Sequence, residues 1–207
     1  MAELADGTVI TIRATGSNEL RELWGGASSV RLPQGFLDAS DFRPIPDNQE
    51  VYIHTSTDQS IIFELTEPVD AHTFVDIGKL HLQSLLADND AEAPEHFRVL
   101  SVKELTESHL PDLRSSPSIG PFMACYVKAE MLVSKFKEQA RNRVLLHLAI
   151  IRLNDVKTDL LITLNHPVQL NPESSSAGSE LAAIPDDVFV TLVKSFRLHS
   201  AFLELFG

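Results

Sequence analysis

The run Arg143-Val-Leu-Leu-His-Leu-Ala-Ile-Ile-Arg152 decides the fold class, because it is apolar at both odd and even positions. Successive side chains of a strand point to opposite faces of a sheet, so a strand with this pattern must be covered on both faces. We therefore predict that this run is a central strand of a sheet with helices on each side.

The segments on either side of this run predict its partners in the sheet. Residues 122–136 are strand-like with a charged edge, and residues 157–164 can pair back across Asn154-Asp155, a dipeptide that suits a tight hairpin. Two hairpins in succession favour antiparallel pairing, because parallel strands need crossover connections. We expect a single α/β (α+β) domain, an α/β/α sandwich around a mostly antiparallel sheet of about six strands.

Two segments with apolar residues at helical spacing predict the covering helices. The first is 70–87 with Asp70 as its N-cap, and the second is 185–196, which begins at Pro185. Their apolar stripes comprise Phe74, Ile77, Gly78, Leu82 and Leu85 in the first, and Phe189, Leu192, Val193 and Phe196 in the second. The apolar tail 200–206 either docks on the sheet or is a partner-binding peptide.

The segment 36–67 holds half of the excess charge of the chain. Its seven acids and one arginine give a local charge of −6 out of a net −12. Residues 49–54 and 60–65 predict a β-hairpin whose turn is Thr57-Asp58-Gln59. An exposed, well-solvated sheet edge would also explain such a cluster of acids.

The expected register of this hairpin places its apolar residues on one face. Val51 and Ile53 would then share that face with Ile61, Phe63 and Leu65. Two registers satisfy this condition, with Glu64 opposite either Glu50 or Tyr52, and both put the two acids on the same face. Like charges directly opposite each other destabilise a sheet.

Composition narrows the class of protein. The chain has 207 residues, 22% of them charged, and a mean hydropathy of +0.00, which is typical of an ordinary soluble domain. A pI near 5.0 argues against nucleic-acid binding, which needs a basic face, and favours basic partners. We see no signal peptide, and no apolar run long enough for membrane insertion, so we expect a protein of the nucleus and cytoplasm.

Catalytic and cofactor motifs are missing from the sequence. It contains no GxxxxGK[ST] phosphate loop and no GxSxG elbow, and its eight histidines form no HxxxH motif or Cys/His cluster. We therefore expect no enzyme, no metal and no cofactor. The single Cys125 excludes an intramolecular disulfide, and we expect it to be a buried strand residue. His54 is close in sequence to the acids of the hairpin, so an acid/base pair between His54 and one of these acids remains an open alternative.

Several motifs resemble those of the Ran guanine nucleotide release factor family. They are Leu23-Trp24-Gly25-Gly26-Ala27, Pro33-x-Gly35-Phe36-x-Asp38-Ala39-Ser40-Asp41-x-Arg43, Pro46-Asp47-Asn48-Gln49-Glu50-Val51, Ile61-Ile62-Phe63-Glu64-Leu65-x-Glu67, Ile151-Arg152-Leu153 and Thr158-Asp159-Leu160-Leu161-Ile162-Thr163-Leu164-Asn165-x-Pro167. The resemblance covers about residues 23–206 and is weakest between 70 and 120.

The resemblance implies a nuclear import factor that binds the GTPase Ran and promotes release of its nucleotide, on a fold similar to PsbP. It implies Glu64 and Glu67 as the first partner-binding residues, with Asp47 and Glu50 nearby, and we add Asp38 and Asp41 from the same acidic segment. We expect a monomer in which residues 23–207 form the Ran-binding domain and residues 1–22 are an extension or an extra edge strand.

Two alternatives remain open at this point. In one, the acids and His54 line a cleft of a small-molecule-binding or hydrolytic PsbP-like domain. In the other, the chain is an adaptor for another protein, such as a membrane channel. A deep, partly apolar pocket at the acids would favour the first alternative, and a flat acidic surface would favour Ran binding.

Overall fold

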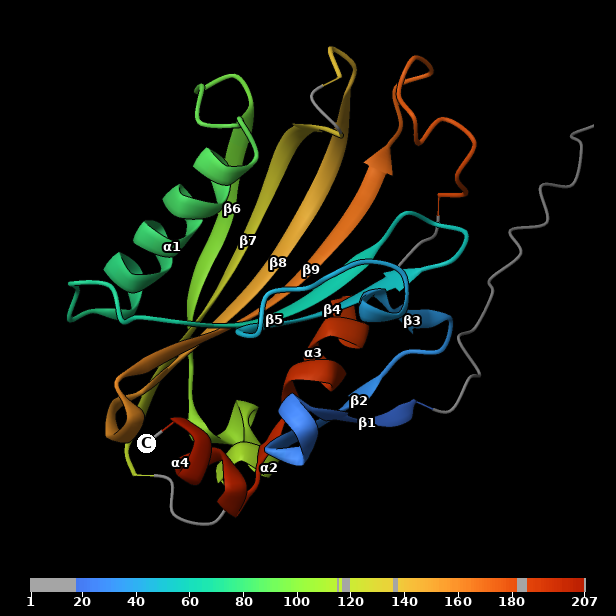
Figure 1. Cartoon of the computed structure of the whole chain (residues 1–207). Coiled ribbons are helices and arrows are strands. Elements are labelled where there is room, and N and C mark those ends of the chain that lie inside the picture. The colour runs from blue at the N-terminus through green and yellow to red at the C-terminus, as the bar shows by residue number, and fades with distance from the viewer. Residues whose placement is uncertain (1–17, 115, 117–119, 136–137, 182–185, 207) are drawn as a thin grey trace, which may run out of the picture.

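A computed structural model describes residues 18–114, 116, 120–135, 138–181 and 186–206. Its main sheet has seven strands in the order β3-β4-β5-β9-β8-β7-β6, all of them antiparallel (Figure 1). They are β3 (Phe36–Asp38), β4 (Gln49–His54), β5 (Ser60–Thr66), β6 (Phe97–Leu105), β7 (Phe122–Ser134), β8 (Arg141–Leu153) and β9 (Thr158–Gln169). The doubly apolar run lies in β8, between β7 and β9, so the prediction of a central antiparallel strand is confirmed.

Helices cover both faces of this sheet, as the pattern of β8 predicts. The even-numbered residues Leu146, Leu148 and Ile150 pack in one core with α1 (Phe74–Asp88). Ala149 and Ile151 point to the other face, into a core with α3 (Asp186–Lys194) and α4 (Ser200–Phe206). The α/β/α arrangement is therefore confirmed.

The second core is closed by a small three-stranded sheet that the sequence only partly predicts. This sheet has the order β1-β2-β10 and contains β1 (Glu19–Leu23), β2 (Ser28–Leu32) and β10 (Arg197–Leu198). The expected boundary between residues 22 and 23 falls inside β1. The strand propensity of residues 8–13 lies outside the described residues.

Short helical turns connect several of the strands. They are η1 (Trp24–Gly26), η2 (Ala39–Asp41), η3 (Glu107–His109), α2 (Pro111–Arg114) and η4 (Asn154–Val156). The last of these makes the predicted connection between β8 and β9, and Lys157 follows it in the left-handed conformation with φ 49°.

The first covering helix begins later than expected. Its N-cap is Thr73, whose hydroxyl accepts a 3.1 Å hydrogen bond from the backbone N–H of Asp76, so the prediction of Asp70 as the cap is wrong. A threonine side chain satisfies an N–H of the first turn as well as an aspartate would. Among the predicted stripe residues, Ile77, Gly78 and Leu82 are buried, and His81 and Leu86 join them.

The apolar tail docks on the protein. It forms α4, and Phe202 is fully buried with its ring 6.4 Å from that of Trp24 in an edge-on contact. Together with Phe196, it extends the core beneath the sheet. The docking prediction is confirmed, and the tail does not act as a free peptide.

The hairpin register differs from both predicted registers. Gln49 lies opposite Glu64, and Glu50 lies opposite Phe63. Glu50 therefore shares a face with Phe63, while Glu64 points to the opposite face, so the prediction that both acids share one face is wrong. The physical reason is that Tyr52, treated as a polar-face residue, is buried in the same core as Phe63.

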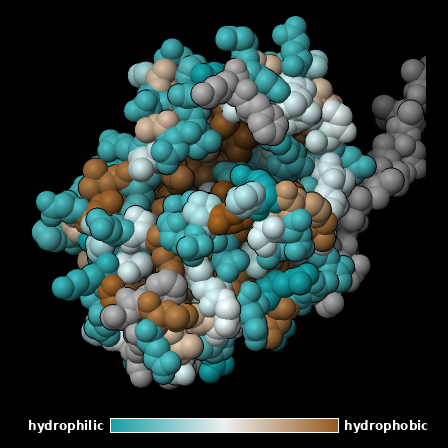
Figure 2. Space-filling view, in the orientation of Figure 1, coloured by the Kyte–Doolittle hydropathy of each residue, from teal (hydrophilic) through white to brown (hydrophobic). Residues whose placement is uncertain are grey.

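The surface in the orientation of Figure 1 is mostly hydrophilic. Figure 2 shows hydrophobic residues gathered at the bottom of a hollow in the upper half of this view. None of the helices in the described ranges is long and apolar enough to cross a membrane.

Candidate partner-binding site

Three of the six predicted site residues line one shallow hollow. Asp38, Asp47 and Glu50 surround a space of about 300 Å³ together with Trp24 and the Ile45-Pro46 loop. The hollow lies at the β3–β4 end of the main sheet, where the chain passes from η2 into β4. The structure thus brings together acids that are up to 12 positions apart in the sequence.

Local turns place the acids that precede β4. Asp38 ends β3 and accepts a 2.8 Å hydrogen bond from the backbone N–H of Ser40, so it caps η2. Asp41 belongs to η2 and Asp47 to the loop before β4, and both side chains are exposed. These are the acid-rich turns expected before an extended Pro-Ile-Pro segment.

Glu50 has a structural partner within the hollow. Its Oε1 accepts a 2.6 Å hydrogen bond from the backbone N–H of Trp24. Burial raises the pKa of the Glu50 carboxyl, the Trp24 N–H opposes this shift, and the negative charge of Asp38 adds to it. Burial dominates because a carboxylate loses water that one N–H cannot replace.

Glu64 lies on the other face of the sheet and is half-buried. Its Oε1 accepts a 2.8 Å hydrogen bond from Nε2 of Gln49, directly opposite on β4. The carboxylate is therefore held in one position while part of it faces solvent. Glu64 does not line the hollow that contains Glu50.

Glu67 is exposed and follows β5 at the start of a loop that is fixed by a buried ion pair. Arg152 binds Asp159 through two 2.8 Å contacts and also donates to the carbonyl of Val69 at 2.8 Å. The backbone N–H of Val69 in turn donates to Asp159 at 3.1 Å. The sheet thereby anchors the loop two residues after Glu67.

His81 of α1 completes this buried cluster. Its Nε2 lies 2.7 Å from Oδ2 of Asp159, which is fully buried. Burial alone would raise the pKa of Asp159, but hydrogen bonds from Arg152 and His81 and from the Val69 N–H lower it. The cluster joins α1, the loop after β5 and strands β8 and β9.

His54 does not belong to the hollow. Its ring packs edge-on against Phe36, with 5.2 Å between the centroids, and it is not among the lining residues. The cleft of acids and His54 that an acid/base pair would need is therefore not formed. Within the described ranges, no group of three or more His, Cys, Asp or Glu side chains could hold a metal ion.

Cys125 is buried in β7, as predicted. Burial raises the pKa of its thiol to about 12, and the negative charge of Asp159 adds to this shift. A thiol with so high a pKa stays protonated and is a poor nucleophile at neutral pH.

Sequence reasoning missed the contribution of the Trp24-Gly25-Gly26 turn to the site. Trp24 was not among the predicted site residues, whereas the structure places it both in the core and on the wall of the acidic hollow. The signal was present, since this turn and the Pro46–Val51 run both belong to the motifs quoted above. Two motifs that match one family pattern often meet in space.

Comparisons with known proteins point to one family. Residues 21–167 match the family model described as Ran-interacting Mog1 protein. The Ran guanine nucleotide release factor of Danio rerio is 38% identical over 86% of this chain and 95% of its own length. The protein of the same name from Homo sapiens is 37% identical over 89% of this chain and 95% of its own length.

A solved structure supports the fold. The crystal structure of the Saccharomyces cerevisiae Ran-binding protein Mog1p aligns with a TM-score of 0.62 and 25% identity, over 92% of this chain and 98% of that one. The residues that match the family model include β2 to β8, most of β9 and every motif quoted above up to Pro167. The chain therefore belongs to the Ran-interacting Mog1 protein family.

Proposed function

We propose that this chain binds the GTPase Ran through the acidic surface of β3, β4, β5 and their loops, promotes release of guanine nucleotide from Ran, and so supports nuclear protein import. Its relatives bear the names Ran guanine nucleotide release factor and nuclear import protein. The observation that carries the proposal is the concentration of acids in residues 36–67, which have a charge of −6 by sequence and lie in the strands and loops at one edge of the sheet. Of these acids, Asp58 is paired with Lys135. A protein with this function works in the nucleus and the cytoplasm.

The site has two parts that lie on different sides of the hairpin. One part is the hollow with Asp38, Asp47 and Glu50, and Asp41 is exposed in the same segment. The other part is Glu64 with the exposed Glu67 after it. A partner that wraps around the end of the sheet can contact both parts, whereas a flat partner contacts one.

The acids supply a physical route to nucleotide release. Ran must hold the phosphates and Mg²⁺ of its nucleotide with basic and hydroxyl groups, as GTPases do. Carboxylates brought against those groups compete with the negative charge of the phosphates and weaken the hold on the nucleotide. Carboxylates held by hydrogen bonds, such as Glu64 on Gln49, lose little freedom on binding.

The geometry offers no comparable support for the alternatives. The acidic hollow is shallow and mostly polar, unlike the deep, partly apolar pocket that would favour a small-molecule site, and His54 is not among its lining residues. Neither observation suits a hydrolytic or small-molecule site at the acids. No feature of the described residues specifically favours an adaptor role.

The test is release of a fluorescent guanine nucleotide from purified Ran by three charge-matched double variants. Glu64→Lys with Glu67→Lys probes one part of the site, and Asp41→Lys with Asp47→Lys probes the other. Glu92→Lys with Glu95→Lys is the control, because both glutamates are exposed and lie beside β6, the opposite edge of the sheet. All three change the net charge equally.

We expect the control to release nucleotide at the wild-type rate and the first variant to lose binding and release. Each reversed charge in an interface costs several kcal/mol, whereas the same change on a free surface alters stability by about 0.5 kcal/mol. Loss of binding by the second variant, Asp41→Lys with Asp47→Lys, would show that Ran also contacts the acids at and beside the hollow. If all three variants melt normally and release nucleotide as the wild type does, the acidic surface is not the Ran site.

A further inference from the structure

A second hollow lies between α3 and the outer strands β6 and β7, at the edge of the main sheet opposite β3. Its volume is about 320 Å³. One side of it is apolar and is formed by Leu105, Tyr126, Phe189, Val190 and Val193. Phe189 and Val193 are firmly buried, whereas Val190 remains 45% exposed and forms the outer lip.

The other side of this hollow is polar and carries two lysines and a serine hydroxyl. Lys103, Lys128 and Ser101 line it, and the register Ser101 opposite Lys128 places them side by side on two strands. Among the described residues, none of the side chains that line the hollow is a carboxylate. Within the described ranges, Lys103 forms no ion pair.

His109 adds a further donor, and its hydrogen bonds define its tautomer. The backbone N–H of Thr106 lies 3.1 Å from Nδ1 of His109. A backbone N–H can only donate, so Nδ1 accepts, and in the neutral ring Nε2 carries the proton. The ring nitrogen of His109 that is left for a ligand in the hollow is therefore a donor, Nε2–H, and not an acceptor.

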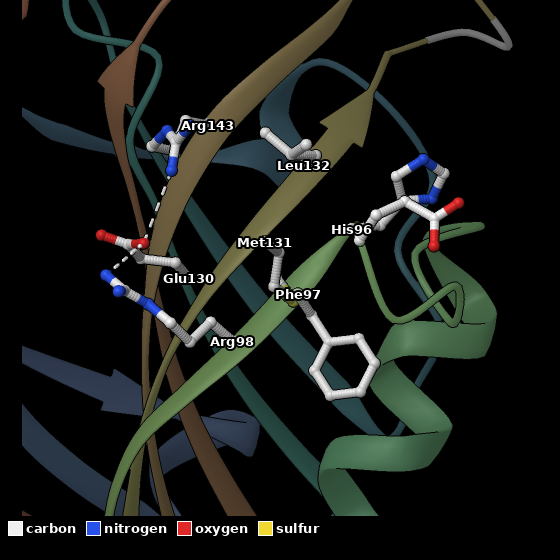
Figure 3. A pocket seen from close by; sticks show the side chains of 8 residues that line it. His96, Phe97, Arg98, Glu130, Met131, Leu132 and Arg143 are labelled. Atoms are coloured by element: carbon white, nitrogen blue, oxygen red, sulfur yellow. Dashed lines mark hydrogen bonds and ion pairs between the residues drawn. The ribbon is translucent and has the colours of Figure 1, made fainter.

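The basic character continues along the same face of the sheet. Arg98 of β6 and Arg143 of β8 approach Glu130 of β7 at 3.0 and 3.5 Å, and Figure 3 shows both arginines directed at this one carboxylate. Two arginines on one glutamate leave an excess of positive charge beside Lys128. The two arginines and the glutamate together give this part of the face a local positive charge in a chain whose net charge is −12.

We propose that this pocket binds a small organic anion with an aromatic or branched apolar body and one carboxylate or sulfonate group. The apolar body packs between Phe189, Val190 and Val193, and the anionic group receives hydrogen bonds from Lys103 and the His109 N–H. The pocket is at the small end of ligand sites, which run from about 300 to 1,000 Å³, so it takes one or two rings and excludes a long acyl chain. This site is separate from the proposed Ran surface.

Two matched fluorescent probes test the proposal on the full chain. Naphthalene-2-sulfonate has a two-ring aromatic body with one sulfonate, and naphthalene has the same body without the charge. We expect saturable one-to-one binding of the anionic probe. In an NMR titration, the shifted amides should be those of Ser101, Lys103, His109 and Val190.

Three variants separate charge, apolar contact and non-specific binding. Lys103→Glu should weaken the anionic probe at least about tenfold and leave the neutral probe nearly unchanged, because it removes a charge-assisted hydrogen bond. Val190→Asp should weaken both probes. Lys79→Glu on α1, with the same change of charge at an exposed site, should alter neither.

Other results would overturn the proposal. One is binding of the anionic probe with several equivalents and no amide shifts in the pocket, which would mark non-specific adsorption. Another is equal weakening of both probes by Lys103→Glu, which would show a general loss of structure instead of anion recognition. A third is equal weakening by Lys79→Glu and Lys103→Glu, which would assign the effect to net charge alone.

Discussion

The backbone N–H of Trp24 lies 2.6 Å from Oε1 of Glu50, and this contact joins residues that are 26 positions apart. Trp24 adopts a left-handed backbone with φ 48°, which is unfavourable for a residue with a side chain. The hydrogen bond holds the turn in that conformation while the indole packs in the core beside Phe202. Glu50 therefore lines the acidic hollow and also fixes the Trp24 turn that forms part of its wall.

Our first prediction concerns this contact. Glu50→Ala leaves a partly buried N–H unsatisfied and should lower the free energy of unfolding by about 1.5–3 kcal/mol. Glu50→Gln keeps an oxygen acceptor and should stay within about 1 kcal/mol of the wild type at pH 7. Urea unfolding at pH 7 measures both values. Equal destabilisation by the two variants would show that the carboxylate charge, not the hydrogen bond, is what matters.

The second prediction compares the wild type with Glu50→Gln at different pH values. The pKa of Glu50 is raised above 4.5 in the folded state, so the folded protein binds this proton more tightly than the unfolded chain does. The contribution of Glu50 to stability is thus fully present below pH 4.5 and is lost as pH rises through the folded pKa. The wild type should lose stability relative to Glu50→Gln over that window, as urea titrations at several pH values would show. A constant difference would mean that the Glu50 pKa is unshifted.

The sequence predicted the sheet and not the hairpin register, and the two cases differ physically. In β8 every residue from Leu146 to Ile151 is buried, on both faces, so the apolar pattern is unambiguous whichever way the strand is paired. In β4, Val51 and Tyr52 are both buried, with 4% and 3% exposure, although they point to opposite faces. The alternation of apolar and polar residues along β4 then carries no information about the register. The prediction left Tyr52 out of the apolar row, and this choice gave the wrong register.

The sequence predicted which segment contains the acidic site, but not how its acids are arranged in space. The density of acids in 36–67 is visible in the sequence, and the structure places the strands of this segment, β3, β4 and β5, at one edge of the sheet. Which acids are free and which are bound depends on distant partners, such as Trp24 for Glu50 and Arg152 for Asp159. No local pattern encodes those contacts.

The buried cluster around Asp159 gives the next prediction. Asp159→Asn removes the negative charge that pairs with Arg152, whose side chain is only 11% exposed, and should cost about 3–5 kcal/mol of stability. The conservative change Arg152→Lys should cost less, because lysine keeps the charge but loses the two-pronged contact. Thermal and urea unfolding of both variants measure the difference.

The cluster also predicts how acid affects the protein. The pKa of Asp159 is lowered below 3.8 on folding, so the stability it contributes is present above pH 3.8 and is lost as pH falls through the folded pKa. The wild type should show a steeper loss of stability below pH 3.8 than Asp159→Asn does. Parallel curves for the two proteins would contradict a lowered pKa.

The proposed Ran contact makes a prediction about salt. A surface of local charge −6 should attract a basic partner, and the Debye length falls from about 10 Å at 0.1 M to about 3 Å at 1 M salt. The association rate with Ran should fall over that range, while the dissociation rate changes less, because steering acts on encounter. Stopped-flow mixing measures both rates. An association rate that is flat across the salt series would point to an apolar interface.

The last prediction concerns the turn that leads into β3 and the acidic segment. Gly35 has φ 89°, and a Cβ added there would lie 2.5 Å from Nε2 of His54, whose ring is held against Phe36. Gly35→Ala should therefore carry two costs, about 1–2 kcal/mol for a left-handed alanine and a further cost for displacing the ring. Gly25 has φ 63° with nothing within 4 Å of an added Cβ, so Gly25→Ala isolates the backbone cost.

A double-mutant cycle separates the two costs at Gly35. In a His54→Ala background the ring is gone, and Gly35→Ala should then cost about as much as Gly25→Ala does in the wild type, about 1–2 kcal/mol. The difference between the two backgrounds, measured by urea unfolding, is the energy of the clash. If Gly35→Ala costs the same in both backgrounds, the His54 ring moves aside freely. In that case, Gly35 is required only for its backbone conformation.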